Sequence, residues 1–482
     1  MYHTLTSVFI NTTKEKIMSK KCTCGCEMDD GFQAPTRALD YLRYLSASES
    51  KPMTVAIAWE REDGHTFRYD LMIPSNIHSS ARPGVVHLVE RCVKFVLWAA
   101  GGWKLYLSGP DWIVKPIAKD YSAKGARKFD YGFFKDLYGK PFEVAIVPLK
   151  KMPETNEREV IVKNNTNGNR IGFDLGASDF KISALKRGKV VFSKEFPWDP
   201  RNQPDPEYHY TKLSAGLEEA AQALGGKVDA IGGSTAGTLV GKRLGPASLL
   251  RAILEKNPKK KDEARNLFTR IEDEWKVPFE VYNDGDVTAL AGAITMKKSG
   301  ILGVAMGSSE AVGYINPKGA LTGRISELAF APVDLNPNAA CDEWSGDAGV
   351  GAMYFSQQAV NHLACKYGFK FPKSMKLPER LKVVQAAMEK HDAKAMKVYL
   401  MIGRYLANAV CWYREFYDFS NLMILGRVTS GFGGELLLET ARMGLEAIDP
   451  ALADEVDVFM PDEKARRLGQ SVAAAQIPVI KK

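Results

Sequence analysis

The sequence contains no long hydrophobic run, although 45% of its 482 residues are hydrophobic. No segment approaches the roughly 18 consecutive apolar residues that a membrane-spanning helix needs. The most apolar stretch, 95–103, is short and contains two glycines. The N-terminus also lacks the apolar core of a secretion signal, because SVFI is followed at once by NTTKEK. These absences predict a cytoplasmic protein with no membrane partner.

Cysteine is scarce and is not arranged as a zinc site. Four of the seven cysteines are scattered, and the other three, Cys22, Cys24 and Cys26, form CTCGC in a polar N-terminal tail. Three alternating thiols suit a soft metal or disulfide exchange, but no nearby histidine or second cysteine pair completes a zinc set. This motif could therefore bind a metal, exchange disulfides or have no function, and the sequence does not decide among the three. Residues 1–33 as a whole are expected to be disordered.

The charge balance is only mildly positive and does not identify a partner. A net charge of +8 comes from 65 basic and 57 acidic residues spread along the chain. Such an excess fits an anionic small ligand as well as nucleic acid. Residues 34–150 mix strands and helices and show no compact three-helix pattern with a basic recognition helix, so no nucleic-acid partner is expected.

Two stretches resemble phosphate-binding P-loops but lack the full motif. GTLVGKR at 237–243 has only three residues between its glycines and carries Arg where Ser or Thr is needed. GRVTSGFGGE at 426–435 has the glycine spacing but no Lys. P-loop chemistry is therefore excluded.

Strand patterns alternate with helical ones along the chain, which predicts an α/β protein. Residues 34–150 read as a small α/β accessory domain without a chemical motif. Residues 151–169 are polar and rich in Asn, as in a linker. The rest is long enough for two lobes, 170–295 and 296–482, and the terminal helix of the second could pack back on the first.

The segment GFDLGASDFKISAL (172–185) places an acid, Asp174, at the end of a buried strand. Small residues follow it, and they let a ligand approach the backbone closely. Amides in such a turn can cradle phosphate oxygens. A carboxylate would repel bare phosphate, so the arrangement makes sense with a metal ion or water between them. An ordinary hairpin with a solvated acid is the competing interpretation.

Four Gly-rich turns lie at strand ends, and a strand-end acid at YND (282–284) joins them. The turns are DLGAS (174–178), GGSTAG (232–237), AMGSS (305–309) and GRVTSGFGG (426–434). Their order and spacing resemble the actin–sugar kinase superfamily and, within it, the ROK (repressor, open reading frame, kinase) group, over residues 170–475. The resemblance implies two ribonuclease-H-like (actin/hexokinase-like) lobes with an ATP cleft between them, beside the small N-terminal α/β domain.

The resemblance also implies roles for single residues. Asp284, in Asn283-Asp284 at the start of a helix, matches the family's catalytic base; a helix N-cap is the competing interpretation. Asp174 would meet Mg²⁺ through water at the ATP phosphates. The implied ATP-binding residues are Asp174, Gly176, Ser178, Gly307, Ser308, Ser309, Gly426, Gly431, Gly433 and Gly434. The implied substrate-binding residues are Asn283, Glu327, Ser234 and Gly237. Leu468-Gly469 and the alanines after them resemble the family's closing helix.

The sequence departs from the family in its sugar site. The family has Glu-apolar-Gly-His where this chain has Glu327-Leu328-Ala329-Phe330. The family's cysteine-rich loop, laid on 343–352, keeps two glycines and no cysteine, so a structural zinc is not expected. A phenyl ring at Phe330 can pack against an apolar sugar face or fill the space beside this loop. The loop must then be held by packing, for example through Trp344, and Asp342, Glu343 and Asp347 could offer new polar contacts.

Together these observations predict ATP-dependent phosphorylation of a carbohydrate or related polyhydroxy molecule, with ATP and Mg²⁺ as cofactors and an Asp general base. The alternative is a non-catalytic sugar- or nucleotide-binding regulatory protein on the same fold. It is favoured by the altered phosphate turns, the lost His and the extra N-terminal domain. The sequence does not identify the sugar or the hydroxyl that is phosphorylated, and it leaves open whether the protein forms a homodimer.

Overall fold

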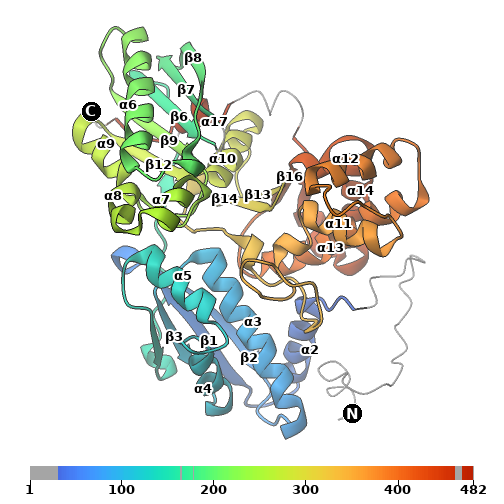
Figure 1. Ribbon diagram of the computed structural model, residues 1–482. Helices are drawn as coiled ribbons and strands as arrows, with labels where there is room; N and C mark the ends of the chain where they lie inside the picture. Colours follow the sequence, from blue (N-terminus) through green and yellow to red (C-terminus); the bar gives the residue numbers. More distant parts are fainter. Residues whose placement is uncertain (1–30, 163–164, 177–178, 462–468, 481–482) are drawn as a thin grey trace.

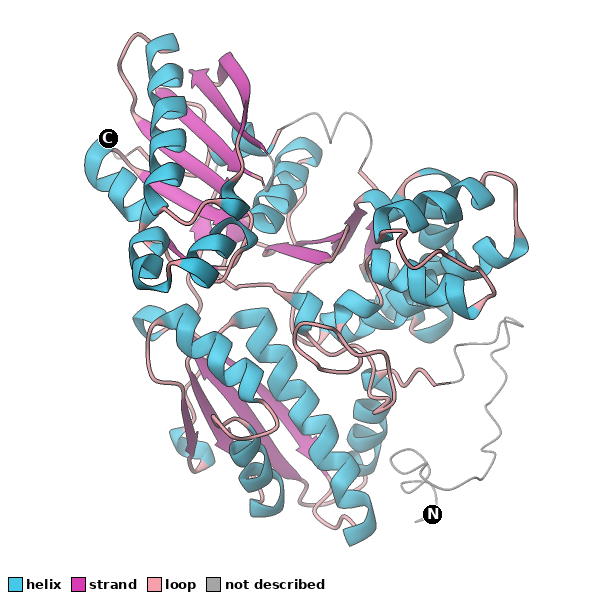
Figure 2. Cartoon of the chain, viewed as in Figure 1, coloured by secondary structure: helices cyan, strands magenta, loops and turns pink. Residues whose placement is uncertain are grey.

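The computed structural model describes residues 31–162, 165–176, 179–461 and 469–480 (Figure 1). The CTCGC motif, Ser178 and Leu468 therefore lie outside the described residues. Within these ranges, three larger sheets are flanked by helices (Figure 2). No helix in the described ranges is both long enough and apolar enough to cross a membrane.

The N-terminal unit is built on a four-stranded sheet in the order β2-β1-β3-β4. Its strands are β1 (Met53–Glu60), β2 (Thr66–Ile73), β3 (Lys104–Ser108) and β4 (Glu143–Ile146). Its helices are α2 (Pro35–Ala47), α3 (Arg82–Ala100), α4 (Asp111–Asp120) and α5 (Lys128–Tyr138). The predicted hairpin at Asp63-Gly64 joins β1 to β2. Helix α3 is buried along most of its length, so it forms the centre of this unit.

A five-stranded sheet in the order β12-β9-β6-β7-β8 forms what we call the first lobe. Its strands are β6 (Asn169–Leu175), β7 (Asp179–Lys186), β8 (Lys189–Pro197), β9 (Ala230–Thr235) and β12 (Phe279–Asn283). Its helices are α6 (Pro206–Ala223), α7 (Arg251–Lys256), α8 (Lys261–Arg265), α9 (Leu267–Trp275) and α10 (Asp284–Met296). A short hairpin joins β10 (Leu239–Val240) to β11 (Arg243–Leu244).

The C-terminal helix α17 (Gln470–Ala474) packs against the first lobe. Glycines make this close approach possible. A Cβ at Gly172 on β6 would lie 1.8 Å from the Ser471 carbonyl oxygen, and one at Gly232 on β9 would lie 1.8 Å from that of Ala474. Any side chain at either glycine would push the helix off the sheet.

A six-stranded sheet in the order β17-β16-β13-β14-β15-β5 forms what we call the second lobe. Its strands are β13 (Ile301–Met306), β14 (Glu310–Ile315), β15 (Ala320–Leu321), β16 (Asn421–Leu425), β17 (Asp457–Phe459) and β5 (Val160–Ile161). Its helices are α11 (Gln357–Lys366), α12 (Leu377–Met388), α13 (Ala393–Arg414), α14 (Gly431–Ile448) and α15 (Pro450–Glu455). Strand β5 falls within the expected linker, and it pairs with β15.

The N-terminal unit shares one apolar core with the second lobe. Phe95 on α3 stacks on Phe416 with ring centroids 4.3 Å apart, and it meets Trp412 of α13 edge-on at 5.2 Å. At the surface, Arg43 of α2 donates to Glu415 at 2.7 Å. The unit is therefore packed into the molecule rather than tethered to it.

Candidate functional site

The strand order of the first lobe brings the predicted acid Asp174 beside Ser234. Strands β6, β9 and β12 run parallel, with Asp174 opposite Ser234 and Ser234 opposite Tyr282. The Ser234 hydroxyl donates to Oδ1 of Asp174 at 2.7 Å. Burial raises the pKa of Asp174 above its ordinary value, against the lowering effects of this hydrogen bond and of Lys181. Carboxyl ends of parallel strands meet at one sheet edge, which is where α/β proteins form ligand sites.

Asp284 follows β12 directly and opens α10. The N-cap is its neighbour Asn283, whose side-chain oxygen accepts from the Gly285 amide at 2.8 Å. Asp284 Oδ1 also accepts from that amide, at 2.9 Å. Burial, and then the negative charge of Asp174, raise the pKa of Asp284 to about 6. The two carboxylates are thus close enough for the charge of Asp174 to affect the ionisation of Asp284.

Asn283 also ties the second Gly-rich turn to the start of α10. Its amide nitrogen donates to the Gly237 carbonyl at 3.1 Å. Both side-chain ends of Asn283 are therefore engaged, one in capping and one in positioning the turn. Asn283, Ser234 and Gly237, which the sequence predicted as substrate-binding residues, are adjacent in the structure.

Glu327 adds a third carboxylate from the second lobe. It precedes the short helix η7 (Leu328–Phe330), and its Oε1 accepts from the Thr238 hydroxyl of the first lobe at 3.1 Å. Burial, and then the charge of Asp284, raise the pKa of Glu327 to about 7. The predicted base and the predicted substrate residue therefore lie in one electrostatic neighbourhood, between the two lobes.

Two further buried acids were missed by sequence reasoning. Asp286 accepts from the Tyr314 amide at 3.0 Å, and burial raises its pKa to about 7. Glu310 accepts from the Tyr413 hydroxyl at 3.2 Å, and burial raises its pKa to about 8. The other oxygen of Glu310 has no hydrogen-bond partner among the described residues. Neither acid carries a motif, and only the tertiary fold buries them.

The predicted phosphate turn, Gly307-Ser308-Ser309, connects β13 to β14. The Gly307 amide donates to the Ser309 carbonyl at 2.9 Å, while the Gly307 carbonyl accepts from the Gln357 amide at 2.9 Å. The turn is thus held at both sides, and its two serines are exposed. Exposed hydroxyls on a fixed backbone suit contacts with phosphate oxygens.

The predicted nucleotide-binding glycines lie where β16 meets α14. A Cβ at Gly426 would lie 2.5 Å from the Met306 carbonyl oxygen, and one at Gly434 would lie 1.9 Å from that of Thr429. A Cβ at Gly433 would lie 2.5 Å from the Tyr399 ring, and Gly431 opens α14. These glycines bring the start of α14 close to the strand ends, beside the phosphate turn. Gly176 continues β6, and its amide donates to the Asp179 carbonyl at 3.0 Å.

Phe330 is part of an aromatic cluster. Its ring centroid lies 4.7 Å from that of Trp98 on α3 and 5.1 Å from that of Trp344. Phe129 of α5 lies 6.4 Å away. Of the two roles foreseen for this ring, filling space beside the loop at 343–352 matches these contacts. Trp344 packs there, as foreseen, although 58% of its surface is exposed.

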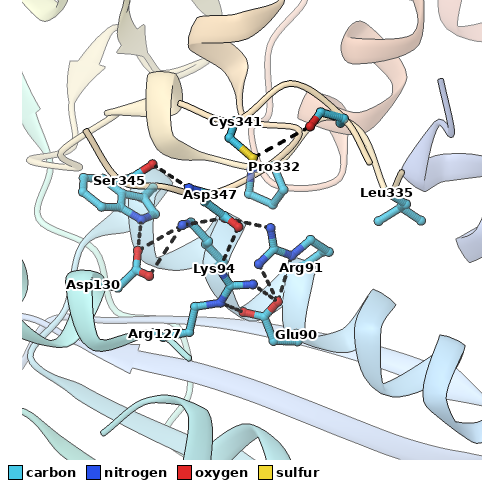
Figure 3. A network of polar contacts seen from close by, with 12 residues as sticks. Glu90, Arg91, Lys94, Arg127, Asp130, Pro332, Leu335, Cys341, Ser345 and Asp347 are labelled. Carbon is cyan, nitrogen blue, oxygen red and sulfur yellow. Dashed lines mark hydrogen bonds and ion pairs between the residues drawn. The ribbon is translucent and has the colours of Figure 1, made fainter. Parts of the chain in front are cut away.

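The same loop is fastened by Asp347, which binds three cations of the N-terminal unit (Figure 3). Its carboxylate pairs with Arg91 at 2.8 Å, Lys94 at 2.7 Å and Arg127 at 2.9 Å. Burial acts to raise the pKa of Asp347, but Arg91 and Lys94 hold it below its ordinary value. Asp342 serves the loop itself, accepting from the Ser345 amide at 2.6 Å. Sequence reasoning missed this network because its partners, such as Arg91 and Asp347, are 256 residues apart in the chain.

Comparison with solved structures identifies the fold. No family model matches the sequence, and no curated protein matches it. The ROK hexokinase from Thermus thermophilus matches the structure with a TM-score of 0.50, at 18% identity, over 64% of this chain and 98% of the hexokinase. The chain has the ROK kinase fold. The predicted fold class and the predicted resemblance are thereby confirmed at the level of the fold.

Other structures with the ROK fold match more weakly. A ROK family glucokinase from Streptomyces griseus, in complex with glucose and AMPPNP, gives a TM-score of 0.45 at 19% identity, over 64% of this chain and 99% of the glucokinase. A ROK family transcriptional regulator, a homolog of the E. coli MLC protein, gives 0.48 at 16% identity, over 65% of this chain and 78% of the regulator. About a third of the chain has no counterpart in the hexokinase or the glucokinase.

Proposed function

We propose that the protein transfers the γ-phosphoryl group of ATP to a hydroxyl of a carbohydrate or related polyhydroxy molecule. One observation carries this proposal. Asp174 and Asp284, at the ends of parallel strands β6 and β12, are near enough for the charge of one to raise the pKa of the other. Paired acids beside Gly-rich turns suit phosphoryl transfer, in which positioning and charge stabilisation supply most of the catalysis.

Asp284 is the proposed general base. With a pKa of about 6, it is ionised at neutral pH and can still accept a proton readily. As the substrate oxygen attacks the γ-phosphorus, its proton passes to the Asp284 carboxylate, and the bond to the ADP oxygen breaks. Asn283 and Glu327, with Ser234 and Gly237, would orient the substrate hydroxyls. Closure of the two lobes would exclude water.

The chain's donor set fits a magnesium ion held mainly by phosphate and water. Asp174 is a partly buried acid, and among the described residues its one side-chain hydrogen bond comes from the Ser234 hydroxyl, so a cation nearby would balance its charge. Among the described residues, no group of three His, Cys, Asp or Glu is arranged to hold a metal by itself. Mg²⁺ bound with ATP would supply charge neutralisation at the phosphates. Gly307, Ser308 and Ser309 would contact those phosphates, and Gly426, Gly431, Gly433 and Gly434 would line the nucleotide side.

A non-catalytic sugar- or nucleotide-binding role is the second candidate. The contacts of Phe330 favour it, because an aromatic ring packed against Trp98 and Trp344 supplies no hydrogen bond to a sugar. Such a protein would bind its ligands without turnover.

Sugar-dependent ADP release by the purified protein tests between the two. A panel of hexoses, amino sugars and polyols is supplied with ATP and Mg²⁺, and nucleotide binding is measured in parallel. We expect ADP release with at least one member, reduced about a hundredfold or more in Asp284→Ala. Nucleotide binding without ADP release across the whole panel would favour the binding role.

A further inference from the structure

A cavity of about 660 Å³ lies outside the proposed active site, between α5 and the first lobe. One side is formed by α5 and the turn that follows it, and the other by β11 and α8. None of its lining residues belongs to the predicted ATP or sugar sites. It therefore calls for an explanation of its own.

The cavity is strongly basic. Five cationic side chains line it, against two acids, which leaves an excess of three positive charges. The cations are Lys135, Lys140, Arg243, Lys261 and Arg265. They come from both sides, so their mutual repulsion acts across the seam between the N-terminal unit and the first lobe.

The two acids are already committed to three of the cations. Asp136 of α5 accepts from Arg265 at 3.0 Å and from Lys261 at 3.2 Å. The Arg265 hydrogen bond, foremost among the causes, lowers the pKa of Asp136 to about 2. Asp262 accepts from Arg243 at 2.6 Å. No acid remains in the lining for the other two cations.

Two cations in the lining are left without an anion, and a third keeps one donor without a partner. Lys135 and Lys140 are exposed and form no ion pair with any described residue. The Lys140 ammonium lies 5.0 Å from the centre of the Trp103 ring, a cation–π contact that leaves it free to meet an anion. Arg265 is fully buried, and its Nε has no hydrogen-bond partner among the described residues. This nitrogen is closed off from solvent, so the two lysines are the donors that a ligand in the cavity can reach.

We propose that this cavity binds a small molecule that carries two or more phosphate groups. Several phosphate oxygens can accept from Lys135, Lys140 and the neighbouring guanidinium groups at once. The volume is ample for a diphosphate or triphosphate. A ligand held by both sides ties α5 to the first lobe, so it stabilises their present arrangement. This site goes beyond the proposed kinase reaction and does not depend on it.

Calorimetric titration of the full chain with pyrophosphate, without Mg²⁺ and at low salt, tests the proposal. We expect saturable binding of one pyrophosphate at the cavity, weakened about tenfold or more in the double variant Lys135→Gln/Lys140→Gln, because two charge-assisted contacts are lost. Lys135→Arg/Lys140→Arg keeps both charges and should retain binding. The control Lys150→Gln/Lys151→Gln removes two exposed lysines of the same unit outside the cavity and should leave affinity unchanged.

A further variant separates this site from the ATP cleft. Ser308→Asp puts a negative charge on the proposed phosphate turn, so it should weaken ATP binding and leave pyrophosphate binding at the cavity intact. Absence of saturable binding to the wild type would overturn the proposal. So would equal weakening in the control pair, or loss of binding in Ser308→Asp with retention in the double glutamine variant. Because both target lysines are exposed, melting temperatures within about 1 °C of the wild type should verify folding.

Discussion

At the scale of single residues, the environment of Asp284 sets the chemistry that we propose. Replacing it by Ala should leave nucleotide binding nearly intact and reduce phosphoryl transfer by about a hundredfold or more, the usual scale for a lost general base. Steady-state kinetics on the substrate found in the panel would measure this. The matched control is Asp273→Asn, because Asp273 is an exposed acid on α9 of the same lobe. Turnover near that of the wild type would remove Asp284 from this role.

The raised pKa of Asp284 adds a pH signature to that experiment. A base must be deprotonated to act, so turnover should rise with pH through about 6 and then level off. Below that pH, the rate should fall about tenfold per unit. The residual activity of Asp284→Ala should not show this fall in rate below pH 6. The same fall in the variant would mean that another acid causes it, such as Glu327, whose pKa is about 7.

Phe330 bears on which sugar is accepted. The sequence predicts weak or no activity on glucose. Phe330 and Ala352 stand where the resembling family has a His and a Glu that contact the sugar, and each lost contact is worth on the order of 1 kcal/mol. The packing of Phe330 against Trp98 and Trp344 supports this expectation, since the ring is engaged with protein. Kinetics on glucose and on the best substrate of the panel would check it. A low micromolar KM for glucose with rapid turnover would contradict it.

At the scale of elements, α3 of the N-terminal unit supports the loop at 343–352. Asp347→Asn would leave Arg91 and Lys94, which are 3% and 1% exposed, without their shared carboxylate. Arg91 keeps Glu90 and Lys94 keeps Asp130, so the cost should be below the about 3–5 kcal/mol of a buried charge left wholly unpaired. We expect a lower melting temperature and a higher KM for the sugar, because the loop packs against Leu328, the neighbour of Glu327.

The matched control for this prediction is in the same loop. Glu343 is exposed, so Glu343→Gln also removes one negative charge from the loop but leaves the ion pairs of Asp347 intact. Equal effects of both substitutions, or none from Asp347→Asn, would show that the cations do not hold the loop. A backbone hydrogen bond also joins α3 to the segment before this loop, since the Glu327 amide donates to the Trp98 carbonyl at 2.9 Å.

At the scale of the whole molecule, three acids with raised pKa values should make stability depend on pH. Burial raises the pKa values of Asp286, Glu327 and Glu310 to about 7, 7 and 8. The folded state therefore binds more protons than the unfolded state between about pH 4 and 8, so stability should fall as pH rises through that window. Melting temperatures recorded from pH 5 to 8 would show the decline.

Glu310→Gln offers the sharpest test of this dependence. Gln resembles the protonated acid in shape and cannot ionise, so it should flatten the decline and raise the melting temperature at pH 8 by about 1–2 °C. The control is Glu435→Gln on α14, which removes an exposed carboxylate of the same lobe and should leave the decline as it is. A decline unchanged in Glu310→Gln would mean that Glu310 titrates near its ordinary pKa.

The local features of the site could be predicted from sequence because they depend on neighbouring residues. An acid or a glycine at a strand end is visible in a few letters, and Asp174, Asn283, Asp284 and Gly426 all occur at such ends in the structure. The alternation of strands and helices likewise indicated the α/β class. These patterns follow from backbone sterics and side-chain periodicity, which act over a few residues.

Other features were decided only by the tertiary structure. Asp347 looks like an ordinary loop acid until α3 and α5 bring Arg91, Lys94 and Arg127 to it. Glu310 looks like any strand residue until Tyr413, 103 positions away, covers it. The basic cavity exists only because α5 faces β11 and α8. Charge and burial act through space at distances that sequence separation does not encode, so such contacts appear only when the whole chain is folded.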